Sequence, residues 1–116
     1  MKKISKKKAG VQRRVSKIFR DKKDRNGNRC FLSKSNVMLT PAHIIRQSYS
    51  LALQDDERNI IPLNQYVHHL FDNGGFKELM LLYPWKCKAI IDRMYNLDPL
   101  YANRFLRKNG LENLIR

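Results

Sequence analysis

The stretch that most restricts the fold is NIIPLNQYVHHLFDNGG, residues 59–75. Asn64 is a residue type suited to capping the N-terminus of a helix, and the Asn-Gly-Gly run at residues 73–75 is suited to ending one. A helix of about three turns is therefore predicted between them. His68 and Asp72 are four positions apart, about one helical turn, so their side chains are expected on one face.

An imidazole and a carboxylate on one helix face can bind one divalent cation, Zn²⁺ or Mn²⁺ more naturally than Mg²⁺. A His/Asp pair at this spacing is also a common hydrogen bond on a helix surface, so the pair alone leaves both interpretations open. His69 lies about 100° around the helix from His68, so the two are not expected to bind the same ion. We expect His68 to be the ligand.

The positive charge of the chain, +14 in total, is concentrated at the N-terminus. Residues 1–25 carry twelve Lys or Arg against two Asp, a net charge of +10. Such a segment favours binding to a polyanion through counterion release, so nucleic acid is the leading partner, and a solvated basic tail is the alternative. We expect a disordered basic arm over residues 1–9, followed from Val11 by a basic amphipathic helix. The cations of this helix expected to contact nucleic acid are Arg13, Arg14, Lys17 and Arg20.

The sequence contains no run near the ~18 apolar residues of a membrane span, and its Lys-rich start lacks the apolar segment of a secretory signal. Cys30 and Cys87 stand alone, without the CxxC pairs of a structural zinc site or the number needed for a disulfide framework. We therefore expect a cytoplasmic protein that has no membrane partner, and we disfavour a structural zinc module.

Two short runs of strand-like composition precede the PAHII segment that contains His43. They are RCFLS, residues 29–33, and NVMLT, residues 36–40, and they predict a β-hairpin that leads into PAHII. Residues 46–58 are polar and predict a loop. The hairpin is thus expected to deliver His43 to a defined position.

The C-terminal third of the chain is predicted to be helical. FKELMLLY, PWKCKAIIDRMYNLD and PLYANRFLRKNG indicate two or three helices, with Pro84 and Pro99 near helix starts. Several aromatic residues are expected in the core rather than as base-stacking platforms, namely Tyr66, Phe71, Trp85, Tyr95 and Phe105.

One set of residues resembles the HNH (ββα-metal) nuclease family, in the branch written AHI, N-x-L-x-L, H-x-L-F-D-x-G: His43, Asn59, His68 and Asp72. The matching segments are Ala42-His43-Ile44, Asn59-Ile60-Ile61-Pro62-Leu63 and His68-His69-Leu70-Phe71-Asp72-Asn73-Gly74. Cys30-Phe31-Leu32-Ser33 also resembles the family's first strand. The resemblance covers about residues 29–75, and a joint pattern in this order is far more specific than one His/Asp pair.

The resemblance implies a small ββα-metal core. With the basic N-terminal helix and the C-terminal helical extension at 76–116 that the residues themselves predict, we expect an α+β fold in one domain over 10–116. The resemblance also implies a metal-dependent endonuclease that hydrolyses DNA phosphodiester bonds, by nicking or by double-strand cleavage. The DNA is expected to be double-stranded or branched, and the chain is similar to stand-alone HNH proteins of phage, which act in the host cytoplasm.

In this resemblance His43 is the general base, because an imidazole with a pKa near ~6.5 is largely neutral at physiological pH. Asn59 is expected either to orient that imidazole or to brace the loop. His68 and Asp72 are expected to bind one divalent ion (Mg, Mn, Zn or Ni), and His69 is an outer or DNA-facing residue. The remaining expected phosphate contacts are Arg46 and Arg58.

Many HNH nucleases carry Asp or His directly before the base histidine as a further metal ligand, whereas this chain has Ala42. Asp55 or Asp56, or else water and substrate phosphate, are expected to complete the coordination. The substitution also supports an alternative, a catalytically inactive HNH-fold module that binds nucleic acid. A homodimer is a further possibility, and the residues considered for its interface or for the monomer core are Ile90, Ile91, Met94 and Tyr95.

Overall fold

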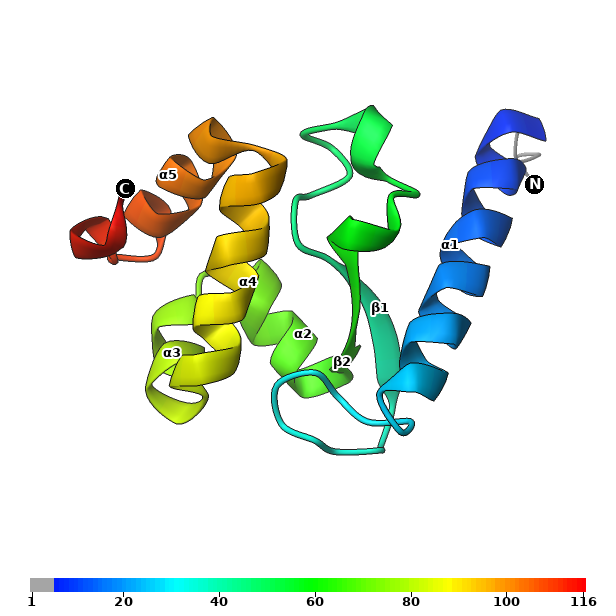
Figure 1. Ribbon diagram of the computed structural model, residues 1–116, viewed down its shortest axis with the longest axis horizontal. Coiled ribbons are helices and arrows are strands. Elements are labelled where there is room, and N and C mark those ends of the chain that lie inside the picture. The colour runs from blue at the N-terminus through cyan, green and yellow to red at the C-terminus, as the bar shows by residue number, and fades with distance from the viewer. Residues whose placement is uncertain (1–5) are drawn as a thin grey trace.

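The computed structural model describes residues 6–116, which form helices on both sides of a two-stranded sheet (Figure 1). The helices and strands are α1 (Lys6–Arg25), β1 (Leu39–His43), β2 (Ile60–Asn64), α2 (Gln65–Asp72), α3 (Phe76–Leu82), α4 (Pro84–Leu97) and α5 (Pro99–Lys108). Short 3₁₀ helices are η1 (Leu51–Leu53), η2 (Glu57–Asn59) and η3 (Glu112–Leu114). The expected α+β class, with a strand-strand-helix core and a helical extension, is confirmed. None of the described helices is long and apolar enough to cross a membrane.

The two strands pair antiparallel, from Leu39 opposite Asn64 to His43 opposite Ile60. The predicted hairpin between residues 29–33 and 36–40 is wrong, because β1 pairs instead with β2 and residues 31–33 form a turn. The sequence did not predict this pairing because each strand contains a proline. Pro41 lies opposite Pro62, and proline lacks the N–H that a strand donates.

The strand-like composition of residues 29–33 has another cause. Cys30 and Leu32 are buried in the core, at 1% and 3% exposure, without belonging to a strand. The Phe31 amide donates to the Pro62 carbonyl at 2.8 Å, so this turn lies along β2. Cys30 and Cys87 are both free and buried, and burial raises the pKa of the Cys87 thiol to about 12.

Helix α1 lies on the side of the strands opposite α2 (Figure 1). Its apolar residues, such as Val15, are partly buried while most of its cations are exposed, which confirms the basic amphipathic helix. The helix begins at Lys6, so residues 6–9, expected in a disordered arm, are helical; Lys and Ala are favourable helix formers. The rest of that prediction, residues 1–5, lies outside the described residues.

Helices α2 to α5 form the other side of the molecule, and an aromatic cluster joins the β-β-α unit to the C-terminal helices. The ring centroids of Phe76 and Phe105 are 5.0 Å apart, and each lies within 5.8 Å of the Phe71 centroid. The predicted helices beginning at Pro84 and Pro99 are confirmed. Of the two roles considered for the α4 residues, the structure supports the core, because Ile90, Ile91 and Met94 are buried.

Two aromatic residues predicted in the core lie on the surface instead. Tyr66 is 73% exposed and Trp85 is 83% exposed. Both stand in the first turn of a helix, α2 and α4 respectively, on the solvent-facing side.

Phe76→Ala is expected to lower the free energy of unfolding by about 3–5 kcal/mol, because it leaves a cavity at the centre of the aromatic cluster. Urea unfolding followed by circular dichroism at 222 nm measures this change. Trp85→Ala is the control, and its effect should stay within about 0.5 kcal/mol because the ring is exposed. Equal effects of the two substitutions would contradict the role given to Phe76.

Candidate active site

His43 is the last residue of β1 and is 9% exposed. Its Nε2 atom lies 2.8 Å from the Gln54 carbonyl oxygen, which can only accept, so Nε2 carries the proton. Nδ1 therefore keeps its lone pair and accepts from the Gln47 side-chain amide at 3.1 Å. Burial lowers the pKa of His43, and the Gln54 carbonyl opposes this effect in part. The neutral imidazole thus presents one acceptor nitrogen.

Asn59 braces the loop that connects β1 to β2. It is fully buried; its Oδ1 atom accepts from the Ile45 amide at 2.7 Å, and its Nδ2 group donates to the carbonyls of Ile45 and Leu53 at 2.9 and 3.0 Å. Of the two predicted roles, bracing the loop is therefore the one that these contacts support. The hydrogen bond to the Leu53 carbonyl also holds the residue that follows it, Gln54. The Gln54 carbonyl in turn orients His43.

His68 and Asp72 lie one turn apart on α2, with His68 Nε2 3.0 Å from Asp72 Oδ2. The other nitrogen of His68, Nδ1, lies 2.8 Å from Thr40 Oγ1. The single hydroxyl proton of Thr40 goes to the Leu63 carbonyl at 3.1 Å, so the hydroxyl accepts from His68 Nδ1–H. This arrangement directs Nε2, and not Nδ1, toward the carboxylate.

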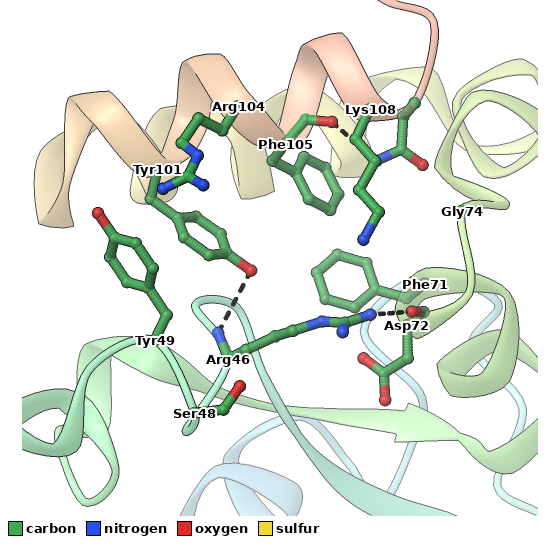
Figure 2. Close-up of a pocket in the computed structure, with 11 residues that line it drawn as sticks. Arg46, Ser48, Tyr49, Phe71, Asp72, Gly74, Tyr101, Arg104, Phe105 and Lys108 are labelled. Atoms are coloured by element: carbon green, nitrogen blue, oxygen red, sulfur yellow. Dashed lines mark hydrogen bonds between the residues drawn. The ribbon is translucent and has the colours of Figure 1, made fainter.

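One hollow of about 560 Å³ brings together three of the four residues predicted for catalysis and metal binding, and we call it the His43 hollow. Its lining residues are Pro41, His43, Arg46, Gln47, Ser48, His68, Asp72 and Asn73. The Arg46 guanidinium reaches the backbone carbonyl of Asp72 (Figure 2), so a cation is fixed at the C-terminal end of α2. The hollow thus combines a neutral histidine acceptor, an imidazole–carboxylate pair and an arginine.

Other predicted residues lie outside this hollow. The Arg58 guanidinium donates two hydrogen bonds to the Asp56 carboxylate, at 2.7 and 3.0 Å. The two side chains therefore bind each other at the start of η2. Asp55 pairs with Arg14 of α1. His69 is exposed and accepts from the Asn73 side chain, which agrees with its exclusion as a ligand. The exposed cations of α1 do not line the hollow either; they are Arg13, Arg14, Lys17 and Arg20.

The pair formed by His68 and Asp72 fits a divalent ion, since it offers one nitrogen and one carboxylate oxygen, both partly accessible, from adjacent turns. Within residues 6–116 there is no group of three or more His, Cys, Asp or Glu side chains that could hold a metal. Neither Asp55 nor Asp56 completes the set, because each is paired with an arginine. For an ion held by this pair, the remaining coordination positions would fall to water or to a bound phosphate.

Thr40, Gln47 and the Gln54 carbonyl were missed by sequence reasoning. Thr40 carries no sequence signal, because it lies three residues before His43 and side chains an odd number of positions apart on a strand point to opposite faces. Gln54 acts through its backbone, which no residue type reveals.

A sequence model described as HNH endonuclease matches residues 15–76, just over half of the chain. The match contains His43, Asn59, His68 and Asp72, and it begins well before residue 29, where the resemblance seen in the sequence started. It ends at the first residue of α3, so that α4 and α5 lie beyond it. No curated protein and no solved structure matches the chain.

Thr40→Val is expected to weaken divalent-ion binding about 10- to 100-fold, because it removes the hydroxyl that fixes His68 Nδ1–H and leaves the shape of the side chain nearly unchanged. Isothermal titration of the protein with Zn²⁺ or Mn²⁺ measures the dissociation constant. Thr40→Ser keeps the hydroxyl and should stay within about threefold of the wild type. Wild-type affinity in Thr40→Val would show that the hydroxyl has no part in orienting His68.

Proposed function

The chain belongs to the HNH endonuclease family, and from this premise we propose that it is a metal-dependent endonuclease that hydrolyses DNA phosphodiester bonds. The observation that carries the proposal is the shared position of His43, His68 and Asp72 in one hollow. A phosphodiester bound there would face a proton acceptor on one side and the paired imidazole and carboxylate on the other.

His43 is proposed as the general base. Its unprotonated Nδ1 takes a proton from the attacking water once the Gln47 amide, which belongs to an exposed side chain, moves aside. The imidazolium formed then keeps its Nε2–H bond to the Gln54 carbonyl, whose partial negative charge stabilises the new positive charge. Asn59 is a positioning residue in this scheme, because it holds the loop that carries Gln54 and touches none of the reacting atoms.

His68 Nε2 and the Asp72 carboxylate would hold the divalent ion, with Thr40 fixing the imidazole. A divalent ion at this position supplies the Lewis acidity that stabilises charge developing on the phosphate and the leaving oxygen. Arg46 places a further positive charge at the rim of the same hollow, where it can bind a phosphate oxygen.

The exposed cations of α1 are proposed to bind the DNA backbone without sequence preference. A catalytically inactive binding module needs neither a neutral histidine acceptor nor an imidazole–carboxylate pair beside it. Ala42, the residue that supported this alternative, is fully buried in the core and does not line the His43 hollow. The geometry therefore favours the nuclease.

Cleavage of supercoiled plasmid tests the proposal directly. The wild type should nick or linearise the plasmid in at least one of Mg²⁺, Mn²⁺, Ni²⁺ or Zn²⁺, and EDTA should stop the reaction. His43→Ala should lower the rate about 10²- to 10⁴-fold, because it removes the general base. His69→Ala is the matched control and should keep the wild-type rate. DNA binding without cleavage of plasmid, single-stranded or branched DNA in any of the four ions would leave the binding module as the better account.

The pH profile of cleavage should report the ionisation of His43. Its pKa is lowered from 6.5, so the midpoint of the acid limb, where half of the base is protonated, should lie below pH 6.5. Single-turnover rates between pH 5 and 8 measure this limb, with the metal ion kept saturating at each pH. NMR titration of the His43 ring provides the independent value. A midpoint above 6.5 in both measurements would be inconsistent with the buried, neutral imidazole.

A further inference from the structure

A second hollow, which we call the Tyr101 hollow, lies between α5 and the segment that follows β1 (Figure 2). Its volume is about 350 Å³. Its lining includes the cationic and aromatic residues Arg46, Tyr49, Tyr101, Arg104, Phe105 and Lys108. Four of them belong to α5, which lies beyond the matched family residues, so this hollow is a property of the C-terminal extension.

The Tyr101 hollow adjoins the His43 hollow, because Arg46, Ser48 and Asp72 line both. The Arg46 backbone amide donates to the Tyr101 hydroxyl at 3.3 Å, which ties the loop after β1 to α5. A strand whose scissile phosphate occupies the His43 hollow would therefore pass its neighbouring nucleotide directly into the Tyr101 hollow.

The Tyr101 hollow is positively charged. Arg46, Arg104 and Lys108 line it, and the one acidic residue among its lining residues, Asp72, stands at the border with the His43 hollow. Within residues 6–116, neither Arg104 nor Lys108 forms a side-chain hydrogen bond or ion pair that would neutralise its positive charge. The Lys108 ammonium points into the hollow, above Phe71 (Figure 2). Unneutralised cations around an enclosed space favour an anion such as a phosphate.

Aromatic rings form a further part of the wall. Tyr49 and Tyr101 lie edge to face with centroids 4.7 Å apart, and Tyr49 is 41% exposed. The volume equals that of roughly twelve waters at ~30 Å³ each, which is more space than a phosphate group fills. Aromatic rings beside cations are the combination that binds unpaired nucleotides, since every base has a face that stacks.

We propose that the Tyr101 hollow binds one unpaired nucleotide next to the scissile phosphate, with its phosphate on Arg104 and Lys108 and its base against Tyr49 and Tyr101. This inference rests on the proposed nuclease function for the position of the cut. A base within a duplex is stacked and paired, and it enters such a pocket only after it is extruded at an energetic cost. The substrate is therefore DNA that is single-stranded beside the cleaved bond, as in a flap or a branch.

Binding to short DNA, measured without metal and in the His43→Ala background, tests this subsite independently of cleavage. The probes are a fluorescent single-stranded 12-mer, the same sequence as a blunt duplex, and a 12-mer composed of abasic nucleotides. Fluorescence anisotropy gives the dissociation constants across a range of salt concentrations. Because no cutting is needed, the result does not depend on whether the protein is a nuclease.

The double variant Arg104→Gln/Lys108→Gln should bind the single-stranded 12-mer at least tenfold more weakly and with a shallower salt dependence. The matched control is Arg107→Gln/Lys88→Gln, which removes the same charge from exposed positions outside the hollow and should cost less than threefold. Equal losses in the two double variants would overturn the phosphate site, because they would reflect overall charge alone.

Tyr49→Ala, in the His43→Ala background, tests the contact with the nucleobase. It should weaken binding of the ordinary single strand at least fivefold, because a stacking surface is lost, and should leave the abasic strand and the duplex unchanged. A Tyr49→Ala effect of the same size on all three probes, or on none of them, would overturn the assignment of an unpaired nucleotide. Circular dichroism of each variant confirms that the fold is retained.

Discussion

The buried side chain of Asn59 is the constraint on which the site depends. It closes the loop from Ile45 to Asn59 through three hydrogen bonds, with no exposure to water that would compete for them. Leaving such groups unpaired costs about 1–3 kcal/mol each, so the loop has one strongly preferred conformation. That conformation sets the Gln54 carbonyl against His43 and places Arg46 and Gln47 at the mouth of the hollow. An asparagine that touches no substrate thereby fixes the tautomer of the proposed base.

The sheet makes the second connection, between the base and the pair on α2. His43 and Thr40 belong to the same strand, and Thr40 contacts both Leu63 on β2 and His68 on α2. A two-stranded sheet alone is marginally stable, so α1 on one side and the α2–α5 core on the other are needed to hold it. The distance between His43, the proposed base, and the His68/Asp72 pair is therefore set by tertiary packing and not by local structure.

The helices were predictable because their signals are local. The cap at Asn64, the glycines after Asp72 and the prolines at the starts of α4 and α5 all lie at or next to the ends of the helices that they delimit. The pairing of β1 with β2 was not predictable in this way, because it joins residues about twenty positions apart and each strand contains a proline. The His68/Asp72 face followed from helical spacing alone, whereas the sequence does not reveal that Arg58 pairs with Asp56.

If His68 and Asp72 hold the ion as proposed, the small number of protein ligands would make ion binding depend on DNA. His68 and Asp72 are two donors, and the charged side chains that were expected to add to them, Asp55 and Asp56, are held by arginines elsewhere. A bound phosphate that supplies further oxygen donors raises affinity for the ion, and by thermodynamic linkage the ion raises affinity for that phosphate by the same factor. In the proposed scheme, the cations on α1 and α5 would contribute to more than attraction of DNA. By holding the strand at both helices, they would favour the phosphate position at which ion and substrate bind together.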